Sequence, residues 1–171
     1  MPDQAFQLSA PNVPLRASAK ASAVPAPGLP NHTPLGPITD RELAACRRNG
    51  TSLAVLAIGL SGLESVAHCH GRAVENQLLH AVWQRLRNHL RGSDVAVHVG
   101  DREFGAILLN ATGSTAALVD ARLSEALSQP YGIGELEIVI SARIGVAVYP
   151  QAGTTGEALA AAAAQNVIAK R

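Results

Sequence analysis

Apolar residues along this chain form two different patterns, a continuous run and a helical repeat, and each pattern predicts one kind of element. The run SLAVLAIGL at residues 52–60 is continuously apolar and of strand length, which predicts a strand buried on both faces. Residues 72–90 instead repeat apolar positions every three or four residues, and this spacing predicts a long amphipathic helix. The apolar stripe of that helix is Val74, Leu78, Val82, Leu86 and Leu90. We expect Arg85, Arg87 and His89 on the opposite side.

Shorter patterns predict the elements that flank these two. Residues 38–50 predict a helix with Thr39 as its N-cap, because Glu42 follows three residues later in a capping-box pattern. Gly50 provides the C-terminal stop of that helix. A short helix or turn is expected over residues 62–71.

The second half of the chain predicts hairpins and two more helices. Residues 97–109 read as two short strands joined by the charged turn Gly100-Asp101-Arg102-Glu103. The remaining expected elements are a helix over 113–129, a strand pair over 135–141 and 143–150, and a last helix over 155–171. Because hairpins outnumber crossovers, the fold class is α/β in the broad sense (α+β). We expect a mixed, mainly antiparallel central sheet flanked by helices.

Composition divides the chain near residue 37. Residues 1–36 alternate Pro, Ala and Ser with few large apolar residues, so they cannot bury enough surface to offset their ordering entropy. We therefore expect a disordered tail or linker over 1–36 and a folded domain over 37–171. The tail serves as a tether or, alternatively, binds a partner.

Charge and cysteine usage exclude several classes of function. A net charge of +1 gives no electrostatic case for binding nucleic acid or an anionic membrane. No apolar run approaches the roughly 18–20 residues of a membrane span, and no apolar segment of a signal peptide opens the chain. Two cysteines, Cys46 and Cys69, read as reduced thiols of a cytoplasmic protein. The cluster His68-Cys69-His70 lacks a second pair of ligands, so we interpret it as a polar turn rather than a zinc site.

Several short strings carry a resemblance to a known family. In chain order they are TPLGPITDREL (33–43), LAVLAIGLSGLE (53–64), HGRAVENQLL (70–79), VGDREF (99–104), SARIGVAVYP (141–150) and IAKR (168–171). Their order and spacing resemble those of the GGDEF domain, the diguanylate cyclase fold related to nucleotidyl cyclases and polymerase palms. The resemblance implies a palm-like sheet.

The same resemblance implies that the catalytic site is degenerate. The two carboxylates that hold divalent metal in the family correspond to Gly59 and Arg102, and a guanidinium repels Mg²⁺. The family's guanine-reading Asn and Asp correspond to Ala67 and Asn76, and Asp101 replaces the second Gly of the name motif. We therefore expect no enzymatic activity, no catalytic residues, no metal site and no Mg²⁺ cofactor.

Two residues of the active-site pattern are retained. Glu103 survives, but one carboxylate without a neighbour is a poor Mg²⁺ site. Lys170 matches the family's phosphate-contacting Lys, although a Lys at a helix C-terminus is equally well explained by the helix dipole.

A second family site matches better. Many GGDEF domains carry an inhibitory Arg-x-x-Asp site that binds cyclic di-GMP at a fixed distance before the name motif, and RGSD at 91–94 supplies Arg91 and Asp94 at that distance. The family adds an Arg on the following helix, and the ungapped match puts Arg122 there. An Arg fork suits guanine O6 and N7, while a carboxylate accepts from the opposite guanine edge. The alternative is structural: a cation at a helix end, a turn Asp and a solvated Arg.

Two functions of different classes follow from the sequence. The first is a non-catalytic cyclic di-GMP receptor in bacterial signalling, with a protein partner downstream. The second is a protein-interaction module that keeps the GGDEF fold and binds no nucleotide. A third, a GTP-binding regulator without turnover, is disfavoured by the losses at Ala67 and Asn76.

Overall fold

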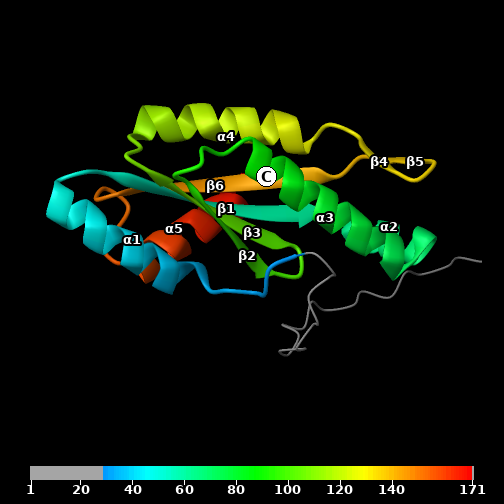
Figure 1. Ribbon diagram of the computed structural model, residues 1–171, viewed down its shortest axis with the longest axis horizontal. Coiled ribbons are helices and arrows are strands. Elements are labelled where there is room, and N and C mark those ends of the chain that lie inside the picture. Colours follow the sequence, from blue (N-terminus) through cyan, green and yellow to red (C-terminus); the bar gives the residue numbers. More distant parts are fainter. Residues whose placement is uncertain (1–28, 171) are drawn as a thin grey trace, which may run out of the picture.

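The structure is a computed structural model that describes residues 29–170. Within that part of the chain the elements follow in this order: α1 (Leu35–Asn49), β1 (Leu53–Ser61), α2 (Leu63–His70), α3 (Arg72–Asn88), β2 (Val95–Gly100), β3 (Glu103–Leu109), α4 (Gly113–Leu127), β4 (Tyr131–Ile133), β5 (Leu136–Ile138), β6 (Ser141–Tyr149) and α5 (Gly156–Ala169). Figure 1 shows α1 at one end of the molecule and α2 with the β4–β5 hairpin at the other. None of the described helices is long and apolar enough to cross a membrane.

A four-stranded sheet in the order β2-β3-β1-β6 forms the centre of the fold. Strand β1 pairs with β3 from Leu53↔Leu109 to Gly59↔Glu103, and with β6 on its other side. Every pairing among the described strands is antiparallel. The predicted fold class, a mainly antiparallel sheet flanked by helices, is therefore confirmed.

Helices cover both faces of this sheet, as the continuously apolar β1 predicted. Successive side chains of β1 alternate between two cores, so Leu56 and Ile58 face one layer while Leu53 and Val55 face the other. The first layer consists of α2, α3 and α4, and the second of α1 and α5 (Figure 1).

The predicted stripe of α3 is confirmed, but its polar side is not uniformly solvated. Leu78, Val82 and Leu86 are fully buried, and Val74 and Leu90 pack against the same core. Arg85, which we expected on the opposite side, turns toward the end of α4. Its guanidinium donates hydrogen bonds to the carbonyls of Ala126, Gln129 and Pro130.

The predicted start of the first helix is wrong. Helix α1 begins at Leu35, and Thr39 lies inside it, where its hydroxyl donates to the carbonyl of Leu35 over 2.8 Å. Pro37 does not prevent this start, because a proline in the first turn lacks only an N–H that would be unsatisfied anyway. The predicted stop is confirmed, since Gly50 adopts the left-handed conformation at φ 63°.

Residues 29–36, which the sequence grouped with the tail, pack against the domain. The side chain of Leu29 is 9% exposed and that of Leu35 is 6% exposed. The amide of Thr33 donates to the carbonyl of His98 on β2 over 2.8 Å. The folded part therefore begins before the boundary predicted at residue 37. The predicted disorder of residues 1–28 concerns a segment outside the described residues.

The predicted pairing of strands 135–141 and 143–150 is also wrong. Residues 136–138 form β5, which pairs with β4 across a turn where Gly134 has φ 61°. Strand β6 instead joins the main sheet beside β1. Three-residue strands are too short to show a period, so no pattern along the chain predicted this second, two-stranded sheet.

Helix α5 packs unusually close to β6 because of one glycine. A Cβ added at Gly145 would lie 1.9 Å from the carbonyl oxygen of Ala163, so no side chain fits there. The same closeness fixes the position of α5 across the sheet. That position leaves the end of the sheet near Gly59 beside the last turns of α5.

Candidate functional site

The tip of the β2–β3 hairpin is tied to α2 and α3 by one arginine. The guanidinium of Arg102 contacts the carboxylate of Glu64 on α2 and lies 3.5 Å from that of Glu75 on α3. Glu75 is 8% exposed, so its charge is mostly removed from water. The position that the resemblance assigns to a metal-holding carboxylate thus carries a cation that is already paired with two carboxylates.

Gly59, the other position at which the resemblance places a lost metal-holding carboxylate, lines a cavity on the opposite side of the sheet. This cavity has a volume of about 730 Å³ and lies between α5, the start of α1 and the hairpin. Most of its lining is apolar, and its charged lining residues are Asp40, Glu103 and Glu157. Among the described residues that line it there is no Lys, Arg or His.

Lys170, the matched phosphate-contacting residue, is engaged elsewhere. Its ammonium lies 2.5 Å from the carboxylate of Asp120 on α4. Asp120 is mostly buried at the side chain, with 19% exposed. The lysine therefore links the end of α5 to α4 instead of adding a positive charge to the cavity.

Arg91 and Asp94 lie on the short loop between α3 and β2. One carboxylate oxygen of Asp94 accepts from the amide of Arg91 over 3.0 Å, and the other accepts from the amide of Leu109 over 3.3 Å. These two bonds fix the loop and hold the carboxylate in one orientation. Each oxygen keeps a second lone pair for another donor. The guanidinium of Arg91 is exposed and makes no hydrogen bond to the described residues.

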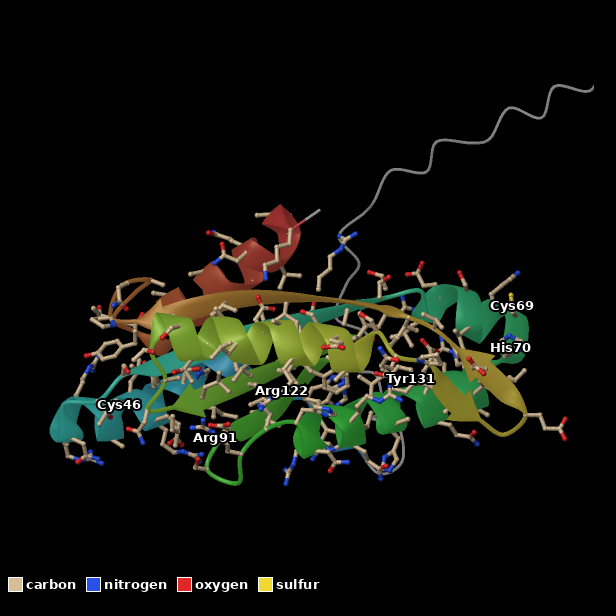
Figure 2. The ribbon with its side chains drawn as sticks, turned by 90° about the horizontal axis from the view of Figure 1, so that it is seen from above. Cys46, Cys69, His70, Arg91, Arg122 and Tyr131 are labelled. Atoms are coloured by element: carbon tan, nitrogen blue, oxygen red, sulfur yellow. The ribbon has the colours of Figure 1, made fainter. Side chains whose placement is uncertain are left out.

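Arg122 reaches the same corner from α4. Its guanidinium donates to the carbonyl of His89 over 2.6 Å, at the end of α3 and two residues before Arg91. Figure 2 shows Arg91 and Arg122 on the same side of the molecule, with Cys69 and His70 remote from them at the end of α2. The structure therefore brings the three predicted ligand-binding residues, Arg91, Asp94 and Arg122, to one corner of the fold.

A third arginine, Arg85, lies four residues before His89 on α3, and its contact was not predicted from the sequence. The guanidinium of Arg85 lies 3.6 Å from the ring centroid of Tyr131, where it stacks on the aromatic face. Burial raises the pKa of Tyr131 above 10.0, and Arg85 opposes that shift. No local pattern indicated this pair, because its members lie on α3 and β4 and meet only in the fold.

A protein-family model matches most of the length of the chain. The family is described as "Diguanylate cyclase, GGDEF domain" and matches residues 25–171. Among solved structures, a sensory box/GGDEF family protein from Caulobacter crescentus CB15 superimposes with a TM-score of 0.74 at 27% sequence identity, covering 79% of this chain and 88% of that one.

Two curated relatives come from Pseudomonas aeruginosa. The bifunctional diguanylate cyclase/cyclic di-GMP phosphodiesterase MucR is 32% identical over 127 residues, which cover 74% of this chain and 18% of MucR. The cyclic di-GMP phosphodiesterase NbdA is 30% identical over 132 residues, which cover 77% of this chain and 17% of NbdA. The chain thus spans less than a fifth of the length of these relatives.

Proposed function

The chain belongs to the GGDEF family of diguanylate cyclase domains, and from that premise we propose that it is a non-catalytic member that binds cyclic di-GMP through Arg91, Asp94 and Arg122. It acts as a receptor in bacterial cyclic di-GMP signalling. The names of MucR and NbdA, which both refer to this nucleotide, support that setting. We place the domain in the cytoplasm, with a protein partner downstream of the ligand.

The hairpin tip supports the absence of catalysis. A cyclase needs divalent metal held by carboxylates at the reacting phosphates. Gly59 has no side chain to offer, and the guanidinium of Arg102 is a cation held by Glu64 and Glu75. The residues present therefore do not fit a divalent cation, because Arg102 repels it and already neutralises the nearest carboxylates.

The cavity beside Gly59 supports the same conclusion for GTP. A triphosphate needs cations or a series of backbone amides to balance its charge. The charged residues lining this cavity are all acidic, and Lys170 is paired with Asp120. A nucleotide triphosphate would therefore meet repulsion where the family's pattern requires attraction.

The chemistry of the Arg91 corner suits a guanine nucleotide. Two guanidinium groups provide forks for guanine O6 and N7 or for phosphate oxygens. The carboxylate of Asp94 is held by two backbone amides and keeps lone pairs for the N–H groups of a guanine edge. Neither contact needs Mg²⁺, so we expect ligand binding without any cofactor.

One observation carries the proposal: Arg122, thirty-one residues after Arg91 in the sequence, reaches the end of the helix that precedes Arg91. The resemblance assigns Arg122 to this site by its position in the sequence, and its contact with the carbonyl of His89 is independent of that assignment. The Arg-x-x-Asp pair and the further Arg of the family pattern therefore lie at one corner of the fold.

Isothermal titration of the domain with cyclic di-GMP tests the proposal. We expect wild-type binding, and a ten- to hundredfold weaker Kd for Arg91→Ala and for Arg122→Ala, since a bidentate Arg–guanine contact contributes roughly 1–3 kcal/mol. Arg72→Ala is the matched control, because Arg72 is an exposed arginine at the other end of α3. No binding at tens of micromolar ligand refutes the receptor and leaves the interaction module as the function.

A further inference from the structure

Helix α5 exposes an apolar stripe that a surface helix normally lacks. Its only charged residue within Gly156–Ala169 is Glu157, and residues 160–164 are all alanine. Ala161 and Ala164 are exposed, and Ile168, which continues their stripe, is 68% exposed. The solvent side of a surface helix normally carries polar residues, so an exposed apolar stripe is typical of a helix face that another surface covers.

The stripe forms one wall of the 730 Å³ cavity, which we call the α5 groove. The lining residues of α5 run from Glu157 to Ile168, a length of about 16 Å at the rise of an α-helix. The opposite wall consists of the start of α1 and the end of the sheet, including Ala57 and Val99. The groove is thus elongated along α5, with about three helical turns of apolar lining.

Gly59 keeps the groove open at the sheet. A Cβ at that position would lie 3.4 Å from Cγ1 of Val167, so any longer side chain would project into the groove. The position that holds a metal-binding carboxylate in the family is therefore part of an apolar floor in this chain. The loss of the metal ligand and the opening of the groove arise from the same residue.

The charged groups of the groove all have one sign. Asp40, Glu103 and Glu157 line it, and all three are exposed. One oxygen of Asp40 accepts from the amide of Gly156 over 2.6 Å, while Glu103 and Glu157 make no ion pair with the described residues. An occupant with basic residues beside an apolar face complements this arrangement.

We propose that the α5 groove binds a basic amphipathic helix of a partner protein. An amphipathic helix in an apolar groove is a recurrent mode of recognition, and about three turns of contact match the length of the groove. A second copy of this chain fits poorly, because a two-fold contact on this surface would bring its carboxylates together. The proposal does not depend on cyclic di-GMP binding, since the groove lies on the α1–α5 face and Arg91 lies beside α3 and α4.

A displayed peptide library provides the test. The probe is a library of amphipathic helices of about four turns, with Ala, Val, Leu or Ile on one face and Lys, Arg, Glu, Asp or Gln elsewhere. It is selected on the purified wild-type chain, and recovered peptides are measured by fluorescence anisotropy. We expect peptides with net positive charge, whose affinity falls several-fold when the salt concentration rises from 50 to about 200 mM.

Matched variants locate the binding surface. Ala164→Phe fills the groove, whereas Gln165→Phe adds the same side chain at an exposed position of α5 that does not line it. We expect Ala164→Phe to weaken binding at least tenfold and Gln165→Phe to change it less than twofold. Ala161→Glu replaces Ala164→Phe if the latter lowers the melting temperature. The proposal is overturned if the recovered peptides are acidic, or if no peptide distinguishes the wild type from the groove variants.

Discussion

Replacing Arg102 by alanine removes the cation that ties the hairpin tip to α2 and α3. The carboxylate of Glu75 then stays in a mostly buried position without its partner, since Glu75 is 8% exposed. Breaking a fully buried pair costs about 3–5 kcal/mol, because one charge remains unpaired. Here the guanidinium side chain is 34% exposed and the contact is 3.5 Å long, so solvent screens the loss.

We therefore expect Arg102→Ala to lower the free energy of unfolding by about 1–2 kcal/mol, with a fall in melting temperature of roughly 3–8 °C. The contact with Glu64 adds little to this, because that side chain is 82% exposed. Urea denaturation of the wild type, Arg102→Ala, Glu75→Gln and the double variant measures the coupling directly.

The cycle has a specific expected result. The loss of unfolding free energy caused by Arg102→Ala should be at least about 1 kcal/mol smaller in the Glu75→Gln background than in the wild type. The reason is that a buried neutral amide tolerates the loss of the cation. In a Glu64→Gln background the loss caused by Arg102→Ala should stay nearly the same. Equal costs in the wild-type and Glu75→Gln backgrounds would refute the conclusion that Arg102 neutralises a buried carboxylate.

Three further predictions follow from the structure. When the wild type or Arg102→Asp is incubated with GTP and Mg²⁺ or Mn²⁺, neither should form cyclic di-GMP above a no-enzyme control. The variant should stay inactive because Gly59 still supplies no metal ligand, and product from either protein would contradict this. In urea denaturation, a chain that starts at residue 37 should have a free energy of unfolding about 2–5 kcal/mol lower than one that starts at residue 29. The shorter chain lacks the buried side chains of Leu29 and Leu35, and equal free energies of unfolding would contradict this. The raised pKa of Tyr131 favours the neutral phenol in the fold, so its stabilising effect is present below pH ~10 and is lost as the pH rises further. As the pH rises above ~10 the wild type should therefore lose more stability than Tyr131→Phe, and parallel pH profiles would contradict this.

The elements that the sequence predicted well are those with a long and consistent apolar pattern. The nine residues of β1 form a continuous apolar run because both faces of the strand are buried, and the stripe of α3 repeats because one side of that helix is buried. The start of α1 was mispredicted because a local capping pattern at Thr39 competes with the tertiary burial of Leu35, and burial prevails. The β4–β5 pair was missed because its strands have three residues each.

The candidate site could be predicted only through spacing relative to a family pattern. Nothing near Arg122 in the sequence distinguishes it from a solvated arginine, and its contact with His89 spans thirty-three residues. The pairing of Arg102 with Glu64 and Glu75 was likewise invisible, because the partners lie on two other helices. The α5 groove was missed for the same reason, since an alanine-rich helix gives no sign of which face the fold leaves exposed.

Titration of the ¹⁵N-labelled chain with cyclic di-GMP, followed by amide chemical shifts, tests the receptor proposal most directly. We expect saturable shifts at His89, Arg91, Asp94, Leu109 and Arg122. Leu109 belongs to this set because its amide donates to the carboxylate of Asp94. The amides of Gly59 and Arg102 should stay unchanged. Shifts centred on Gly59 and Arg102, or no shifts at all, would refute binding of cyclic di-GMP at Arg91, Asp94 and Arg122.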